Sequence, residues 1–592
     1  MKPGVPRVYR FGDFTLDLEG HRLARGTREI PLQPKTFDTL RCLLERPGRL
    51  VTKRELHDRV WGDVAVTDDA LTRCIVAVRK ALGDGASRPL YIQTVPRLGY
   101  RFIGSVEAVD ALSIEPSVAS GGGRTARSLV VLPFLNLSQD PEQEYFADGF
   151  TDLLIADLGR IAALNVISRT SAMSYRASAK PLPEIGRELG VDAAVEGSIL
   201  RAGSRVRITV QLIDARRDRH LWADSYERDL HDILRLQREV AQDVASAIRV
   251  TLTPDESKRL GTARAVDPEV HELYLRGCYF WHKRTADGVA RSVRLFHAAI
   301  ERDALYAPAY AGLAQASGVA GFFGYVPPSQ AFAEMKAYAA RALALDPGLA
   351  EAHACTGAVR LFYEWDWNAA EQCFLRALAE NASYPVAHEW YGWCLFALGR
   401  TDAGLAEVRR ARELDPLSVH ARAAEGMSLY FARRHERAIE QLNAAMELDA
   451  RFPDAHCGLG LNYLQLGMHD RALSQFEEAL TLSGRSAEDV ASLGFAYGDA
   501  GRTADARALL SELEARTARG YVPAIYFAAI HAGLGETERA CDRLEHAFAE
   551  RSSWLVFLRA EPWWDRLRTC SRFTRLLDRM RLKDEDRGLI VS

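Results

Sequence analysis

The spacing of apolar and polar residues changes twice along the chain and predicts three kinds of structure. Near the N-terminus, short alternating runs predict strands at 8–32 and 91–102, and helical spacing between them predicts three helices. Residues 128–255 combine buried-strand and amphipathic-helix patterns, which predicts a compact α/β domain. From residue 267 to residue 582 the pattern is helical throughout. We therefore expect an α+β region followed by an all-α region.

The third predicted helix, within residues 66–84, has two contrasting faces. At about 100° per residue, an apolar arc of about 100° predicts a buried face and holds Leu71, Cys74, Ile75, Val78 and Leu82. The opposite arc, of about 120°, is mostly polar and basic and holds Asp69, Thr72, Arg73, Val76, Arg79 and Lys80. We expect the first face to pack in a core and the second to face a partner.

Local signals place the other helices and a hairpin. KTFDTLRCLLER has helical spacing before a stop signal at 46–48, and Thr52 with Glu55 forms a capping box that begins the next helix. YIQTVPRLGYRF alternates like two strands broken at 96–99, which predicts a hairpin with Arg97 near its tip. A sheet, three helices and a hairpin make a winged helix-turn-helix, in which one helix fills the major groove of DNA.

Residues 8–104 resemble the winged-helix effector domain of the OmpR/PhoB family. The match is carried by the N-terminal sheet, VW at 60–61, VRKAL at 78–82 and QTV…GYRF at 93–102. It implies double-stranded DNA as the partner, with base edges met by the recognition-helix residues Thr72, Arg73, Val76, Arg79 and Lys80. It also implies wing and backbone contacts by Trp61, Thr94, Arg97, Tyr100 and Arg101.

Two departures separate this domain from many members of that family. Val76 and Ala77 stand where arginine is common, and the wing reads VPRLG where VRGxG is commoner, so the target sequence cannot be taken from a relative. Val76 either contacts a thymine methyl group or is a plain surface residue. The alternative for the whole domain is a winged helix that binds protein.

The charge is unevenly distributed and supports a polyanionic partner for the N-terminal region. Residues 1–105 hold 19 Lys and Arg against 12 Asp and Glu, a net charge of +7, whereas the whole chain carries −3 and the rest therefore −10. The nine cysteines include no CxxC pair, which favours reduced, buried thiols over a disulfide framework or a zinc site. No apolar run could span a membrane and the first residues lack a signal-peptide pattern, so we expect a cytoplasmic protein without cofactors.

A polar segment and an α/β domain follow the first domain, at 1–105. Residues 106–127 are small, polar and glycine-rich, which predicts a flexible linker. In 128–255, strict alternation predicts inward-facing Val206, Ile208, Val210 and Leu212. LPF near its start and GSILRAG…VRITVQLID resemble the N-terminal domain of TolB, from which no activity follows. A solvated helix face is the interpretation for Asp148, Asp152 and Asp157, because the chain has no nucleotide, metal or nucleophile motif.

A period of 34 residues governs the C-terminal half. It relates Trp365, Gly399, Arg433, Gly467, Gly501 and Gly535, and small residues recur at Gly392, Gly426, Gly460 and Gly494. This period, with small residues where two helices cross, is the signature of tetratricopeptide repeats. We expect an α-solenoid over 267–582 whose inner groove binds a protein or peptide.

Two sets of residues in the repeats could be interpreted as binding sites, one for a metal ion and one for an aromatic or apolar partner. His353, His388, His420 and His456 occur about once per repeat, and at about 10 Å or more apart they would be too distant to share a metal ion. Trp554, Trp563 and Trp564 are expected to cap the solenoid, with an aromatic binding patch as the alternative.

Together these features predict a sequence-specific transcriptional regulator, similar in plan to one-component regulators of the CadC/HilA type. We expect the α/β domain and the repeats to control it, through dimerisation on DNA or contact with RNA polymerase. The rivals are a protein-interaction scaffold with a vestigial winged helix and an enzyme within 125–255. We expect no enzyme, because no catalytic motif occurs.

Overall fold

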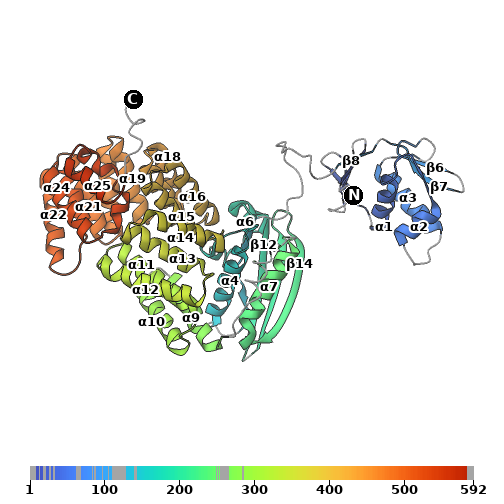
Figure 1. The fold of residues 1–592 in the computed structure, drawn as a ribbon, viewed down its shortest axis with the longest axis horizontal. Coiled ribbons are helices and arrows are strands. Elements are labelled where there is room, and N and C mark those ends of the chain that lie inside the picture. The colour runs from blue at the N-terminus through green and yellow to red at the C-terminus, as the bar shows by residue number, and fades with distance from the viewer. Residues whose placement is uncertain are drawn as a thin grey trace. The chain divides into compact units, whose positions relative to one another are not determined.

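The chain forms two compact units, residues 1–124 and 125–592 (Figure 1). The computed structural model describes residues 8–11, 14–17, 22–25, 28–30, 32, 34–61, 68–82, 84–85, 89–95, 98–104, 106–109, 128–138, 143–203, 205–248, 250, 252–253, 256, 266–282 and 286–582. Among these residues, no helix is both long and apolar enough to cross a bilayer.

The first unit begins with an antiparallel sheet. Its strands are β1 (Val8–Phe11), β2 (Phe14–Asp17), β3 (Arg22–Arg25), β4 (Arg28–Ile30) and β8 (Glu107–Val109), in the order β4-β3-β2-β1-β8. The first four confirm the predicted N-terminal sheet. β8 pairs with β1 in the register Val8↔Val109, inside the segment whose composition predicts a linker. This strand was missed because three residues are too short a run to show alternation.

The helices and the wing follow in the predicted order: α1 (Pro34–Leu44), β5 (Leu50–Thr52), α2 (Lys53–Trp61), α3 (Asp68–Leu82), β6 (Ile92–Val95) and β7 (Gly99–Phe102). β5, β7 and β6 form a second antiparallel sheet. The capping box is confirmed: the Thr52 N–H donates to Glu55 Oε2 at 2.9 Å, and the Glu55 N–H donates to Thr52 Oγ1 at 3.2 Å. The hydrogen bonds from Thr52 lower the pKa of Glu55.

The apolar face of α3 packs in the core of this unit, as its spacing predicts. The buried residues of α3 are Leu71, Ile75, Val78 and Leu82. They pack with residues of α1, α2 and β7, among them Phe37, Leu56 and Phe102. Cys74, predicted on the same face, is half-buried. The other side of α3 is therefore left facing solvent.

The second unit starts with an α/β module. Its strands are β9 (Ser128–Val131), β10 (Leu135–Asn136), β11 (Asn165–Val166), β12 (Ala193–Ala202), β13 (Arg205–Asp214) and β14 (Arg219–Asp229). The sheet has the order β11-β9-β12-β13-β14, with β10 beside β12. The pairs β11–β9, β9–β12 and β10–β12 are parallel, and the pairs β12–β13 and β13–β14 are antiparallel. The helical elements are α4 (Glu144–Gly159), α5 (Arg169–Met173), α6 (Leu182–Leu189), η2 (Leu230–Asp232) and α7 (Ile233–Ala247).

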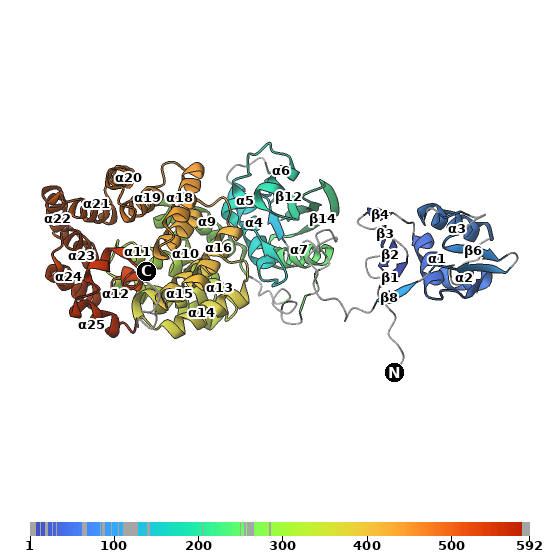
Figure 2. The same cartoon turned by 90° about the horizontal axis from the view of Figure 1, so that it is seen from above.

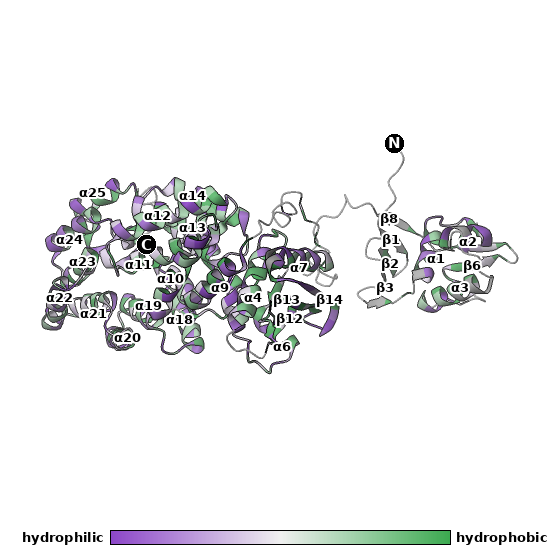
Figure 3. Ribbon diagram, turned by 90° about the horizontal axis from the view of Figure 1, so that it is seen from below, coloured by the Kyte–Doolittle hydropathy of each residue, from purple (hydrophilic) through white to green (hydrophobic). Residues whose placement is uncertain are grey.

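Helices cover both faces of this sheet. On one face α4 and α7 pack over Val206, Ile208, Val210 and Leu212, which are buried as predicted. On the other face α5 and α6 pack beside β9. β14 forms one edge of the sheet, and its mostly exposed residues are largely hydrophilic in Figure 3.

Helix pairs make up the rest of the second unit. They are α9 (Pro268–His282), α10 (Ala286–Arg302), α11 (Ala307–Phe322), α12 (Pro328–Leu345), α13 (Ala350–Val359), α14 (Trp367–Glu380), α15 (Pro385–Ala397), α16 (Thr401–Leu414), α17 (Val419–Phe431), α18 (His435–Leu448), α19 (Pro453–Gln465), α20 (His469–Leu482), α21 (Ala487–Asp499), α22 (Thr503–Thr517), α23 (Ala524–Gly533) and α24 (Thr537–Ala549). A π-helical turn, η3 (Arg360–Glu364), follows α13. The described residues end with the 3₁₀ helices η4 (Ser553–Phe557) and η5 (Pro562–Leu567) and with α25 (Ser571–Arg579).

The 34-residue period marks the turn inside each helix pair. Its four glycines, Gly399, Gly467, Gly501 and Gly535, all have φ between +72° and +77°. Glycine is favoured there because a side chain makes the left-handed backbone unfavourable. Trp365 and Arg433 hold the same positions with φ of +57° and +59°, so these two side chains must compensate for the strain.

The small residues at the helix crossings are confirmed. A Cβ added to Gly426 would lie 2.6 Å from Leu442, and one added to Gly460 would lie 2.8 Å from Phe476. Both neighbours belong to the second helix of the same pair. Any larger side chain would therefore push the paired helices apart.

The solenoid curves until its last helices reach earlier ones (Figure 2). The rings of Trp365 and Phe548 are 4.9 Å apart, and Arg551 lies 4.4 Å from the Trp365 ring. The Trp367 Nε1–H donates to the Met580 carbonyl at 2.9 Å. Trp365 thus joins η3 to α24, which explains a tryptophan at a position where most repeats have glycine.

Candidate functional site

The solvent-facing side of α3 carries the predicted recognition residues. Thr72, Val76 and Lys80 are exposed, and 57% of the surface of Val76 is accessible. The side chain of Arg73 lies outside the described residues, as do the side chain of Trp61 and the whole of Arg97. The described part of this face offers a hydroxyl, a methyl-bearing group and an ammonium, which suit base edges or phosphates.

Arg79 connects α3 to the wing. Its Nη2 donates to the Ile92 carbonyl at 2.7 Å and to Thr94 Oγ1 at 2.8 Å. The side chain is half-buried, and its Nε is buried without a hydrogen-bond partner among the described residues. The guanidinium that the resemblance assigns to base edges is thus engaged with β6 and fixes the wing against the helix.

The remaining wing residues divide between surface and core. Thr94 is exposed and Arg101 is half-buried. Tyr100 is only 6% exposed, and its ring packs in the core, so little beyond its edge can reach a phosphate. Sequence reasoning missed Asp84, which is buried and accepts hydrogen bonds from the N–H groups of Leu90 at 2.6 Å and Ile92 at 2.8 Å. Asp84 therefore holds the N-terminal end of β6 near the C-terminal end of α3.

The interpretation as a solvated face is wrong for Asp148 and Asp157 of α4. Asp148 and Asp157 are 4% and 5% exposed. Asp148 contacts Arg176 and Arg169, and Gln237 Nε2 donates to Asp157 Oδ2 at 2.7 Å. α4 packs against the sheet, α7 and α9, so Asp148 and Asp157 are paired inside the protein, whereas Asp152 is half-buried.

Asp152 links the α/β module to the first helix of the solenoid. Its Oδ2 lies 3.4 Å from His282 Nε2 on α9 and 3.9 Å from Arg169 Nε on α5. Burial opposes ionisation of Asp152, but the hydrogen bond and charge of His282 and the charge of Arg169 outweigh it and lower the pKa of Asp152.

A second set of buried contacts joins the module to the repeats farther along. Ser171 donates to Asp415 Oδ1 through its N–H at 3.1 Å and its hydroxyl at 2.6 Å, and its oxygen accepts from the Leu417 N–H at 2.9 Å. The Ser168 N–H donates to the Leu414 carbonyl at 2.8 Å. Burial raises the pKa of Asp415 in spite of the serine hydrogen bonds. The module and the repeats therefore form one body held by buried polar contacts.

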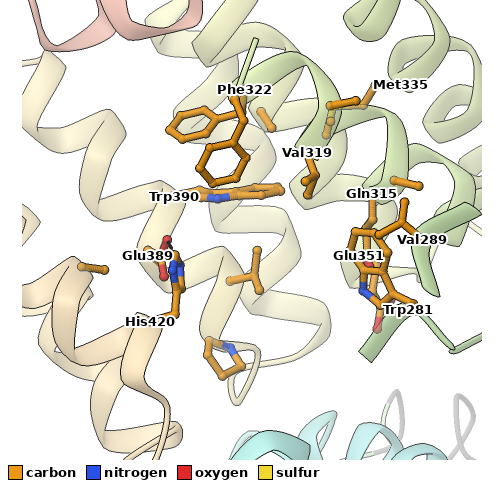
Figure 4. Close-up of a pocket in the computed structure, with 18 of the residues that line it drawn as sticks. Trp281, Val289, Gln315, Val319, Phe322, Met335, Glu351, Glu389, Trp390 and His420 are labelled. Carbon is orange, nitrogen blue, oxygen red and sulfur yellow. Dashed lines mark hydrogen bonds and ion pairs between the residues drawn. The ribbon is translucent and has the colours of Figure 1, made fainter. Parts of the chain in front are cut away.

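The inner face of this body borders a partly open chamber of about 2200 Å³ (Figure 4). Glu389 and His420 lie side by side on one wall, with Glu389 Oε1 3.1 Å from His420 Nε2. The opposite wall carries Trp281, Gln315 and Glu351. Aromatic and acidic groups converge here, as in sites for organic ligands and peptide side chains. Among the described residues, no group of three or more His, Cys, Asp or Glu side chains could hold a metal ion.

Three of the four histidines that recur in the repeats form hydrogen bonds with the turns between repeats. The Nε2 atoms of His353, His388 and His456 lie 2.8, 3.1 and 3.0 Å from the carbonyls of Pro347, Ala382 and Ala450. In each case the carbonyl is six residues earlier in the sequence. The recurrence of histidine is thus explained by a repeated local hydrogen bond.

Residues 551–569, here called the inner segment, line the chamber. They lie along the first helices of several pairs, here called the inner helices, among them α11 and α17. The Phe557 ring stacks on Phe431 with 4.6 Å between centroids, and Ser553 Oγ donates to the Gly321 carbonyl at 3.2 Å. Arg433 pairs with Asp565 through two contacts of 2.7 and 2.8 Å. Arg433 holds the second non-glycine position of the period, so its backbone strain is compensated by a contact to this segment.

The C-terminal tryptophans therefore lie on the inner face and not over the end of the solenoid, which corrects the predicted cap. Trp564 is buried, and Trp554 and Trp563 are half-buried along the chamber. Trp563 stacks on Phe495 of α21 at 5.4 Å. Part of the groove expected to receive a partner is filled by the chain itself.

Comparison with known proteins assigns two of these regions to families. Residues 27–102 match the family described as transcriptional regulatory protein, C terminal, and residues 453–485 match the tetratricopeptide repeat family. The transcriptional regulator HilA of Salmonella typhi is 25% identical over 432 residues, which cover 72% of this chain and 73% of that protein.

Two further relatives match shorter segments. Putative adenylate cyclase 3 of Rhizobium meliloti is 41% identical over 186 residues, 31% of this chain and 32% of that protein. The transcriptional activator CadC of Escherichia coli strain K12 is 32% identical over 97 residues, 16% of this chain and 19% of that protein. The chain thus spans about a third of the length of the first and about a fifth of the second.

Proposed function

From a chain that carries an OmpR/PhoB-type domain and tetratricopeptide repeats, we propose a sequence-specific transcriptional regulator controlled by its second unit. The observation that carries this proposal is the exposed face of α3 beside the wing, within the segment that matches the regulatory family. The regulator names of HilA and CadC agree with it. We place the protein in the cytoplasm, where DNA is accessible.

In this proposal the two parts of the winged helix act differently on DNA. Arg73, Val76 and Lys80 read base edges in the major groove, and Thr72 supports them. Arg97 and Trp61 hold phosphates, and Thr94 and Arg101 lie beside them on the wing. Arg79 positions the wing, because its guanidinium already binds β6. Tyr100 contributes chiefly by packing in the core of the winged helix.

In this proposal, the activity of the regulator is controlled by binding in the chamber on the inner face of the second unit. A ligand or peptide bound there alters the second unit as one body, because Asp152 and Asp415 tie the module to the repeats. The altered unit changes dimerisation on DNA or contact with RNA polymerase. The activity in the name of the putative adenylate cyclase is not carried over, since the matching segment covers only 32% of that protein.

Salt dependence of DNA binding separates this proposal from a protein-binding winged helix. Phosphate contacts release counterions, so the observed affinity should fall steeply with salt, with a logarithmic slope of about −0.9 per phosphate contacted. Fluorescence anisotropy with the full chain and random duplex DNA measures this slope. Absent or salt-independent binding would favour the scaffold.

A further inference from the structure

Two cysteines that flank the inner segment in the sequence lie close together in the structure. Cys541 lies on α24 and is 2% exposed, and Cys570 directly precedes α25 and is half-buried. Their Sγ atoms are 3.6 Å apart. A disulfide requires an S–S distance of about 2.05 Å, so the two sulfurs must approach each other further before they can bond.

The part of the chain between these cysteines includes the whole inner segment. Residues 551–569 leave the end of α24, run along the inner helices past Phe431 and Arg433, and return to α24 at Cys570. A bond between Cys541 and Cys570 would turn this excursion into a closed covalent loop. The segment could then no longer leave the inner face by peeling away from its C-terminal end.

The surroundings of the two sulfurs give them different roles. Burial raises the pKa of Cys541 to about 12. Burial acts in the same direction on Cys570, but the N–H groups of Phe573 and Arg572 at the start of α25 outweigh it and lower the pKa of Cys570. Cys570 is therefore the more readily ionised and the more exposed of the two thiols, and Cys541 is the buried thiol beside it.

We propose that Cys541 and Cys570 form a reversible disulfide that locks the inner segment onto the solenoid. The oxidant is a hydroperoxide. The Cys570 thiolate attacks its terminal oxygen, the O–O bond breaks, and a sulfenic acid forms while an alkoxide or hydroxide leaves and takes a proton from water. Cys541 sulfur then attacks the sulfenic sulfur, and its proton leaves with the hydroxyl group as water. A dithiol reductant reverses the bond.

Peptide mapping of the full-length protein tests the pairing. After stoichiometric hydrogen peroxide, digestion without reductant should give one major cross-linked peptide pair, joining Cys541 to Cys570. Cys541→Ser should leave a sulfenic acid at Cys570 that dimedone traps, and Cys570→Ser should abolish both products. Cys373→Ser, at another half-buried cysteine, is the matched control and should change nothing. A pair that involves another cysteine, or equal oxidation of Cys373 and Cys570, would overturn the proposal.

Hydrogen exchange tests the locking. Because closing a loop of this length removes chain entropy from the opened state, amides of 553–567 should exchange about tenfold more slowly after oxidation. The Cys541→Ser protein, treated in the same way, should show no slowing. If the disulfide forms and exchange in 553–567 is unchanged, the segment is not held by it and the locking role is refuted.

Discussion

A single carboxyl group in the inner segment should make the stability of the second unit depend on pH. Glu561 is 7% exposed, accepts a hydrogen bond from the Tyr430 hydroxyl at 2.5 Å, and accepts another from the Trp563 N–H at 3.3 Å. Burial raises its pKa from 4.5 to about 7, with the two hydrogen bonds and the charge of Arg433 acting in the opposite direction. Asp565 adds to the increase.

The sign and size follow from this pKa. A carboxyl group whose folded-state pKa is above its unfolded value contributes its full stability below about pH 4.5, and this contribution is lost as pH rises through about 7. The difference between 4.5 and about 7 corresponds to about 3 kcal/mol, at about 1.4 kcal/mol per pKa unit. Glu561→Gln keeps an oxygen acceptor for Tyr430 but does not titrate.

Urea unfolding followed by tryptophan fluorescence measures the difference. The stability of the Glu561→Gln protein relative to the natural one should increase by about 2.5 kcal/mol between pH 5 and pH 8. Glu447→Gln, at an exposed position on α18, is the control and should show no such trend. An equal difference at both pH values would refute the assignment of the buried charge to Glu561.

Three further changes test other contacts. Arg433→Ala keeps the left-handed backbone and loses the ion pair with Asp565 of the inner segment, so the free energy of unfolding should fall by about 1 kcal/mol in the same urea assay. Arg433→Gly loses the same ion pair but also removes the backbone strain, so its free energy of unfolding should be nearly unchanged. Ser171→Ala leaves Asp415 with fewer donors and should lower that free energy by about 1–3 kcal/mol; no change would mean that this contact does not hold the module. In anisotropy, Arg79→Ala should weaken target and random DNA by similar factors, whereas Arg73→Ala should change which sequences bind, and the reverse pattern would contradict these roles.

Local rules predicted the elements well because each rests on neighbouring residues. The Thr52–Glu55 capping box, the alternation on β13 and the apolar face of α3 all depend on spacing within one element, and the structure confirms them. The 34-residue period likewise predicted the repeats, and the structure shows that its glycines lie in turns, where a left-handed backbone favours glycine.

Contacts between distant segments could not be predicted in this way. The aspartates of α4 alternate with apolar residues as on any surface helix, and only the packing of the folded chain shows that Asp148 and Asp157 are buried. One feature of the sequence is related to the contact between the early repeats and the C-terminal region. Trp365 and Arg433 replace glycine at two positions with a left-handed backbone, and both side chains contact the C-terminal region. The contact of Arg79 with the wing could not be predicted from the sequence, because Ile92, whose carbonyl accepts its hydrogen bond, lies on another element.

Selection of genomic fragments by the full-length protein tests the central claim most directly. The account predicts a short recurring motif, which an Arg73→Ala, Lys80→Ala double variant should lose while an Arg437→Ala control, changed at an exposed position on α18, retains it. Fragments no more enriched than random DNA, or a motif that the double variant binds equally well, would contradict sequence reading by α3.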